Sequence, residues 1–337
     1  MEYVNCVSCG SGRARTLWRV PNDRYLKALN VSPSTSVKVL CGQCGHIYAN
    51  PQLSSQELRR LYSGVYRSPA LGYADDGPSQ EYLYWKTLKA ERDYQWLRDR
   101  LPSRVRPGSA LEVGCAEGLL LSMLAGDGWS VLGVEPTATY ATHARQEYGV
   151  EVIEAVFEDA QLEGRRFDLA IAMDVLEHTN DPFAFLAKLR TLLAPNGAAY
   201  ITTPNVLRLA EPVEELSSPH LSLFTPDTLR QTFARSGFAV VGLSDRVELV
   251  ALAKPVDPAR ASEPLAEPAS RAALRRAIFR ARLRQVERRS LAAGRQVIKR
   301  SLQTLVGRQR SARLLVWLGH SGGKSDHPGA GGRKARL

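Results

Sequence analysis

The chain has 337 residues, of which 44% are hydrophobic and 23% are charged. This length allows two domains with a sizeable core, and the composition is ordinary for a soluble globular protein. No apolar run reaches the roughly 18 residues that a membrane-spanning helix needs. The first residues, MEYVNCVSCG, lack the basic and apolar regions of a secretory signal. We therefore expect a cytoplasmic protein.

The formal net charge of +11 is concentrated at one end of the chain. Residues 1–258 contain 26 Lys and Arg against 30 Asp and Glu, whereas residues 259–337 contain 19 against 4. The basic character therefore belongs to the C-terminal tail, and it says little about what the main body binds.

Two Cys-x-x-Cys pairs lie in residues 1–50, CVSC at Cys6 and Cys9 and CGQC at Cys41 and Cys44. In a chain without a secretory signal, such cysteines favour metal binding over disulfides. Four thiolates in this pattern, with glycines easing the turns, suit a tetrahedral zinc ion. The pattern predicts a zinc ribbon with a structural Zn²⁺, because four sulfurs leave no open coordination position. A set of unrelated free thiols is the alternative.

Residues 51–108 are interpreted as a helical connector. SSQELRRLYSGVY begins with serines that suit a helix N-cap, and EYLYWKTLKAERDYQWLRDRL predicts a longer helix over roughly 81–101. Pro102 and Pro107 separate this helix from the segment that follows.

Residues 109–253 alternate short apolar runs with helical stretches. This alternation predicts an α/β fold, with a Rossmann-like, seven-stranded, mostly parallel sheet and helices on both faces. The predicted strands are 110–114, 131–135, 150–154, 167–173, 198–204, 238–244 and 247–253.

A turn of small residues, LEVGCAEG, closes the first of these strands. Gly114, Ala116 and Gly118 allow backbone amides to approach a ligand at the start of a helix. Glu112 and Glu117 would repel a pyrophosphate but attract an ammonium group. The turn therefore favours a ligand that has a cationic amino-acid end and no phosphate.

Glu135 ends the second strand, where a carboxylate can accept hydrogen bonds from both ribose hydroxyls. The alternative is that Glu135 only caps the strand. A ribose and an amino-acid end without phosphate together describe S-adenosylmethionine.

Four motifs in this order, LEVGCAEG, VLGVEP, FDLAIAMDVLEH and LAPNGAAYITTPN, resemble those of class I S-adenosylmethionine-dependent methyltransferases, over about 109–244. The resemblance implies that Glu112 and Gly114 lie at the methionine end and that Glu135 holds the ribose. It also implies that Asp174 and Leu176 border the cofactor.

The chain departs from this pattern at the adenine. Relatives often have Gly-Asp where this chain has Ala155 and Val156, so Phe157 is expected to pack against the adenine or to offer backbone groups. Glu158 is an alternative partner for the adenine amino group.

Residues 1–50 and the segment after them, with CGHIYANP and SSQELRRLY, resemble the zinc-binding module that precedes many bacterial methyltransferases. Such enzymes occur in sugar, polysaccharide and secondary-metabolite pathways. The resemblance therefore implies a small-molecule or glycan acceptor.

Asp174, Glu177 and His178 form the first group of candidates for chemistry. Offsets of three and four residues would place them on one face if the segment starts a helix. The group resembles the acidic-His motif that binds a divalent ion in quinone O-methyltransferases, with Asp replacing a Glu. The alternative is that Glu177 and His178 only brace the helix.

His220 is the second candidate, in SSPHLSLFTPDTLRQTF. The stretch resembles the loop and helix over the substrate pocket of related enzymes, and a histidine near neutral pKa suits a general base. Thr225 and Pro226 predict the helix start, as N-cap and first helical residue. A structural hydrogen bond is the alternative for His220, and Asn205 is a further pocket-lining candidate.

The C-terminal part is divided by composition. Residues 254–268 are a Pro-rich linker, 269–318 predict basic amphipathic helices, and 319–337 predict a disordered tail. The basic helices are compatible with peripheral association with an anionic membrane, or with docking on the core. Nucleic acid is a less favoured partner, because few aromatic residues interleave with the arginines.

The sequence therefore predicts a methyltransferase that uses S-adenosylmethionine to O-methylate a small hydroxylated acceptor, most plausibly a sugar or glycan intermediate. His220 is the expected base, with His178 and Glu177 as further catalytic candidates. One alternative is a metal-assisted quinone- or catechol-type O-methyltransferase. Another is a nucleic-acid-associated binding protein with a degenerate cofactor site, and N- and C-methylation also stay open.

Overall fold

The computed structural model describes residues 1–73, 77–101, 107–210 and 212–257, together with Leu274, Arg276, Ala277, Phe279 and Arg280. These residues belong to the first of two compact units, Met1–Ala281 and Arg282–Leu337. Apart from those five positions, the linker beyond residue 257, the basic helices of 269–318 and the tail of 319–337 lie outside the described residues. Within the described part, no helix is both long and apolar enough to cross a membrane.

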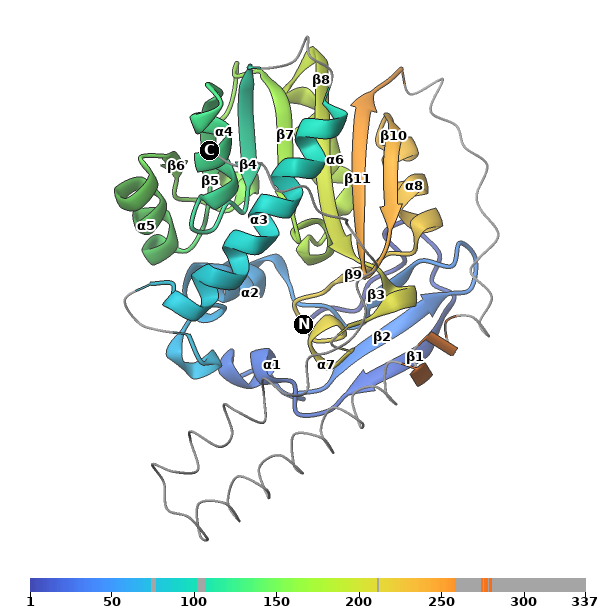
Figure 1. Cartoon of the computed structure of the whole chain (residues 1–337). Helices are drawn as coiled ribbons and strands as arrows, with labels where there is room; N and C mark the ends of the chain where they lie inside the picture. The colour runs from blue at the N-terminus through green and yellow to red at the C-terminus, as the bar shows by residue number, and fades with distance from the viewer. Residues whose placement is uncertain are drawn as a thin grey trace, which may run out of the picture. The chain divides into compact units, whose positions relative to one another are not determined.

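A seven-stranded sheet dominates the described part of the chain (Figure 1). Its order is β10-β11-β8-β7-β4-β5-β6, with parallel pairing from β8 to β6 and antiparallel pairing of β11 with β8 and β10. The prediction of a mostly parallel sheet is confirmed. The strands are β4 (Ser109–Val113), β5 (Ser130–Val134), β6 (Glu151–Ile153), β7 (Phe167–Met173), β8 (Leu193–Pro204), β10 (Phe238–Asp245) and β11 (Glu248–Pro255). The last strand thus includes the first two residues of the predicted linker.

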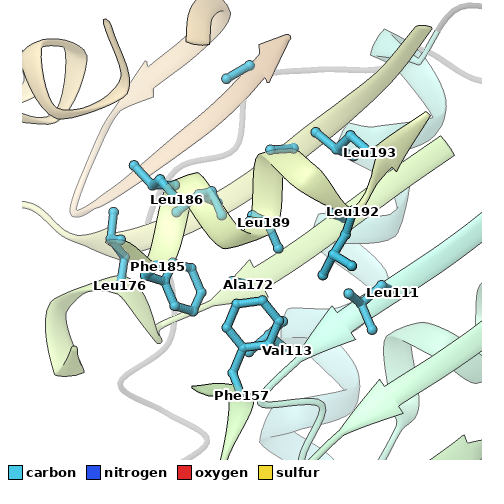
Figure 2. Close-up of a cluster of buried hydrophobic side chains, with 14 of the residues drawn as sticks. Leu111, Val113, Phe157, Ala172, Leu176, Phe185, Leu186, Leu189, Leu192 and Leu193 are labelled. Atoms are coloured by element: carbon cyan, nitrogen blue, oxygen red, sulfur yellow. The ribbon is translucent and has the colours of Figure 1, made fainter. Parts of the chain in front are cut away.

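Helices cover both faces of this sheet because its central strands are apolar on both sides. Leu111 and Val113 of β4 face one hydrophobic cluster, whereas Ala110 faces the other, as the two-residue period of a strand requires. The first cluster includes residues of α6 (Pro182–Thr191) and α8 (Pro226–Arg235). Figure 2 shows Phe185, Leu186 and Leu189 of α6 packed over this face.

The other face is covered by three helices. They are α3 (Gln80–Arg100), α4 (Leu119–Gly126) and α5 (Ala138–Tyr148). The 21-residue helix α3 crosses in front of the sheet in Figure 1. It confirms the long helix that was predicted over roughly 81–101.

Two helices begin at the residues that the sequence indicated, and the first is α8, where Thr225 is the N-cap and Pro226 the first residue. Ser79, which was not predicted as a cap, caps α3. Ser54 caps α2 (Ser55–Arg60) in a reciprocal capping box with Glu57. A π-helical turn, η1 (Leu61–Val65), continues α2 and brings Tyr62 toward the large sheet.

A second, four-stranded sheet has the order β1-β2-β3-β9 among the described residues. Its strands are β1 (Ala14–Val20), β2 (Ser36–Cys41), β3 (Ile47–Ala49) and β9 (Ser222–Leu223). The last of these comes from the C-terminal half, where α7 (Pro212–Glu215) precedes it. The N-terminal sheet is therefore not confined to residues 1–50. Asp23 accepts hydrogen bonds from the first turn of the short helix α1 (Arg24–Ala28).

Candidate functional site

A cavity of about 820 Å³ opens where β4, β5 and β7 end. Because β4 pairs with β5 on one side and with β7 on the other, this edge is the topological switch point of the sheet. Ligands of open α/β sheets bind in such crevices. The cavity is lined by the turn after β4, the ends of the neighbouring strands and residues of α2 and η1.

The small-residue turn adopts conformations that favour glycine. Gly114 and Gly118 have φ of 69° and 80°, and Ala116 has a φ of 51°. Gly118 is the N-cap of α4 and makes no side-chain capping bond. The Glu135 carboxylate accepts the N–H of Ala116 at 3.0 Å and that of Thr137 at 2.9 Å. The cavity is lined by Gly114, Ala116 and Glu135. Gly118 is not a lining residue, and its left-handed conformation serves the start of α4.

Glu112 is the most unusual acid of this region. It lines the cavity and is 1% exposed, and its Oε2 has no hydrogen-bond partner among the described residues. Burial, followed by the charge of Glu117, raises its pKa well above the usual range against the opposing effect of Lys89 and Lys86. A buried oxygen without a partner is costly unless a ligand satisfies it. An ammonium group of a bound ligand would do so.

Phe157 is the residue that was expected to pack against the adenine or to offer backbone groups to it. It lines the cavity, and its ring centroid is 5.0 Å from that of Phe185. It belongs to the short 3-10 turn η4 (Phe157–Asp159), whose carbonyls at Phe157 and Glu158 accept hydrogen bonds from Lys188 at 2.7 and 3.0 Å.

Two residues expected at the pocket lie elsewhere. Leu176 is not among the lining residues, because its side chain is buried in the cluster under α6 (Figure 2). Asn205 is also absent from the lining, because its amide donates to the carbonyls of Asp245 and Arg246 and caps a 3-10 turn, η6 (Val206–Arg208). The expectation for Leu176 came from the resemblance and that for Asn205 from its place after a strand, and neither gives the direction of a side chain.

Asp174 does not share a helical face with Glu177 and His178. It has a φ of 54°, and only a single 3-10 turn, η5 (Leu176–His178), follows it. Its carboxylate instead accepts the Thr202 hydroxyl at 3.1 Å and lies 3.7 Å from the Lys89 amine. Burial opposes ionisation of Asp174, but Lys89 and Lys86 hold its pKa below the ordinary value.

In the structure, the third residue beside Glu177 and His178 is His220, whereas the sequence predicted Asp174. The ligating atoms of Glu177, His178 and His220 all lie within 4.8 Å of one another, and all three residues line the cavity. Nδ1 of His178 lies 3.0 Å from the carbonyl of Pro219, and Nδ1 of His220 lies 2.7 Å from that of Glu215. A carbonyl only accepts, so each Nδ1 carries the proton and each Nε2 keeps its lone pair.

The protonation tendencies of this group follow from burial. Burial lowers the pKa of His178 to about 4, and burial together with the nearby His178 lowers that of His220 well below its usual range. Burial and the charge of Asp174 raise the pKa of Glu177, and neither of its carboxylate oxygens has a partner among the described residues. The group therefore offers two imidazoles that burial keeps neutral and a carboxyl group whose two oxygens have no described partner.

The connector supplies lining residues that the sequence did not single out. The Tyr62 ring centroid lies 5.6 Å from that of His178, and the buried Tyr62 hydroxyl has no described partner. The Arg67 guanidinium lies 3.9 Å from the Tyr140 ring centroid and lines the cavity with one unpartnered nitrogen. Both residues follow SSQELRRL in the sequence. The aromatic and basic residues after this capped helix were the feature from which a contribution to the cavity could have been predicted.

The four cysteines of the N-terminal segment come together away from this cavity. Their Sγ atoms lie within 4.8 Å of one another, with 3.6 Å between Cys6 and Cys44 and between Cys9 and Cys41. Disulfides would need about 2.05 Å, whereas sulfurs at about 2.3 Å from one tetrahedral zinc lie about 3.8 Å apart. The donor set and spacing therefore fit zinc. His46 is not in the group, since its Nε2 lies 3.2 Å from the Ser222 hydroxyl.

Comparisons with known proteins find similarity over the part of the chain that forms most of the large sheet. Residues 84–243 match a family model described as a methyltransferase domain. An O-methyltransferase of ubiquinone biosynthesis from Rhodopseudomonas palustris (strain TIE-1) is 31% identical over 99 residues, which are 28% of this chain and 39% of that protein. Its namesake from Acinetobacter baumannii (strain AYE) is 35% identical over 103 residues, 28% of this chain and 43% of that protein. The chain thus spans about two fifths of the curated relatives it matches.

Solved structures of methyltransferases also align with half of the chain. The CcbJ methyltransferase from Streptomyces caelestis has 16% identity and a TM-score of 0.43, covering 50% of this chain and 90% of its own. An S-adenosylmethionine-dependent methyltransferase from Mesorhizobium loti has 19% identity and a TM-score of 0.42, covering 49% of this chain and 99% of its own.

Proposed function

We propose that the chain is an S-adenosylmethionine-dependent O-methyltransferase of a small hydroxylated acceptor. The observation that carries the proposal is the chemistry of one cavity. It is lined by the unpartnered carboxylate of Glu112 beside a glycine turn, and by the group of Glu177, His178 and His220. The family match over residues 84–243 supports the same activity.

The cavity residues fit the cofactor. Glu112 would bind its ammonium, the amides of the turn after β4 would approach its amino-acid end, and Phe157 would pack against the adenine. Glu135 already accepts two backbone N–H groups, so a ribose would share its remaining lone pairs. When bound, S-adenosylmethionine would supply the methyl group from its sulfonium.

We propose a phenolic hydroxyl of catechol or quinol type as the acceptor, in preference to the sugar or glycan hydroxyl that the sequence favoured. The relatives named for ubiquinone biosynthesis support this choice, as do the rings of Tyr62 and Tyr66 that line the cavity. Burial makes His220 a poor proton acceptor for an alcohol, whose own pKa is far higher.

A divalent ion fits the group of Glu177, His178 and His220. Two neutral imidazoles with fixed Nδ1 protons and an unsatisfied carboxylate are a typical ligand set, with the carbonyls of Pro219 and Glu215 as supporting acceptors. The ion would supply Lewis-acid activation of the hydroxyl. The chain's own residues would orient the acceptor against the methyl group, which is where most of the rate enhancement arises.

Chelation separates the two acceptor chemistries. We expect EDTA to lower the turnover of a catechol by tenfold or more, with recovery on adding Mn²⁺ or Fe²⁺, because two of the three ligands are imidazoles. The affinity for S-adenosylhomocysteine and the zinc content should not change, and His220→Ala should reproduce the loss of turnover. Metal-independent methylation of sugars would favour the glycan alternative with His220 as base. A chain that binds neither S-adenosylmethionine nor S-adenosylhomocysteine would overturn the proposal.

We also propose that Cys6, Cys9, Cys41 and Cys44 hold a structural zinc ion. The sulfur spacing supports the proposal. With four sulfur ligands the ion would have no open position, so its contribution would be to stability.

A further inference from the structure

The segment Leu216–Leu221 is here called the His220 loop, and residues 1–50 are called the N-terminal module. Two residues of this module hold the His220 loop from one side. The Lys38 amine donates to the carbonyls of Ser217, at 2.9 Å, and of His220. The Asp23 carboxylate accepts the N–H of Ser218 at 2.7 Å and its hydroxyl at 2.8 Å. The loop backbone is thus fixed by a cation and an anion that both come from the first 40 residues.

Lys38 is unusual because it is 0% exposed. It lies on β2, which pairs with β1 on one side and β3 on the other, so its backbone cannot shift easily. A buried amine is tolerated where its hydrogens find acceptors. The acceptors described for Lys38 are the two carbonyls of the His220 loop, so the amine and the loop backbone depend on each other.

The opposite side of the His220 loop contacts the proposed catalytic group. The carbonyl of Pro219 accepts from His178, and the N–H of Leu221 donates to the Glu177 carbonyl at 2.7 Å. The His220 ring centroid lies 4.7 Å from that of His178. A displacement of the loop backbone would therefore change the geometry of all three catalytic candidates.

We propose that Lys38 is a positioning residue. Its buried amine holds the carbonyls of Ser217 and His220 so that the His220 imidazole is aimed at Glu177 and His178. The role in turnover rests on the function proposed above, but the position of the ring can be measured without any activity.

The experiment compares Lys38→Met with Asn50→Ala in the full chain. Lys38→Met keeps the side-chain length and removes the donors. Asn50→Ala removes two side-chain hydrogen bonds to Val4 within the same module, and among the described residues the Asn50 side chain has no hydrogen bond to the His220 loop, so it is the matched control. The readouts are the Cε1–H signals of ¹³C-labelled histidines, assigned with His178→Gln and His220→Gln, the turnover of a catechol, and the affinity for S-adenosylhomocysteine.

Lys38→Met should shift the His220 and His178 signals and lower kcat by tenfold or more, with the S-adenosylhomocysteine affinity within twofold of the wild type. Asn50→Ala should leave the signals and kcat within twofold. If Lys38→Met does not fold, Lys38→Gln, which keeps an amide donor, should give smaller shifts of the same direction. Unchanged His220 and His178 signals in a folded Lys38 variant would overturn the proposal. Shifted signals in a chain without methyl transfer would overturn only the proposed function.

Discussion

Several residues that line the cavity carry a buried polar atom that has no described hydrogen-bond partner. Oxygens of Glu112, Glu177 and Tyr62 and a nitrogen of Arg67 are buried without a described hydrogen bond, and all four residues line the same space. Each such atom costs free energy in the ligand-free chain. A ligand that satisfies several of them recovers that cost, so the arrangement favours binding over stability.

Proton release from Glu112 on ligand binding would test whether a ligand satisfies these buried atoms. Burial and the charge of Glu117 raise the pKa of Glu112, so its carboxyl group keeps a proton to a higher pH than an exposed glutamate does, whereas an ammonium ligand favours the ionised form. Binding of S-adenosylhomocysteine should therefore release protons, and its affinity should rise with pH until the ligand's own amino group deprotonates near about pH 8.

The measurement is titration calorimetry in buffers of different ionisation enthalpy. Glu112→Gln should weaken binding by tenfold or more and abolish the proton release. Proton release that persists in Glu112→Gln would mean that another group titrates.

The ends of strands and helices decide which residues reach the cavity. The sheet could be predicted from apolar runs, because strands that are buried on both faces are apolar throughout. The starts of helices could be predicted from serines and threonines, because these residues are the preferred N-caps. The single turn after β7 left no such pattern. The sequence therefore placed Asp174 on a helix with Glu177 and His178, whereas its left-handed conformation directs it to Lys89.

The glycine turn after β4 gives a prediction at this scale. A Cβ on Gly114 would lie 2.7 Å from Cγ2 of Val175 at a φ of 69°, whereas a Cβ on Gly149, with a φ of 63°, would meet nothing within 4 Å. Both alanine variants should lose about 1–2 kcal/mol of stability from the left-handed conformation. Only Gly114→Ala should also weaken S-adenosylhomocysteine binding, by tenfold or more.

Urea unfolding and calorimetry of the two variants measure these effects. Equal affinities in Gly114→Ala and Gly149→Ala would show that the turn after β4 does not approach the ligand.

At the scale of the whole molecule, the N-terminal module and the region of the large sheet are joined by β9. Ile47 and Tyr48 of β3 pair with Leu223 and Ser222, and His46 adds a side-chain hydrogen bond to the same strand. A strand of two residues has no alternating pattern that could be recognised in a sequence. Its pairing with residues far away in the chain was equally hidden, so the sequence predicted a ribbon confined to residues 1–50.

This connection links the cysteine cluster to overall stability. Cys41→Ser should lower the zinc content, measured by plasma emission, from about one ion per chain, and it should lower Tm by roughly 5 °C or more. Cys115→Ser should leave the zinc content unchanged, because this buried thiol lies in the turn after β4. Full zinc content in Cys41→Ser would contradict the four-cysteine site.

The shared strand also limits how the molecule can be recombined. A chimera that takes residues 1–50 from another protein would have to accept this chain's β9 as its edge, with the side chains of a foreign β3 against Ser222 and Leu223. The residues that replace Asp23 and Lys38 would have to accept from the N–H and hydroxyl of Ser218 and donate to the carbonyls of Ser217 and His220. The two sequence-distant stretches therefore form one exchangeable part, and successful grafts should carry both.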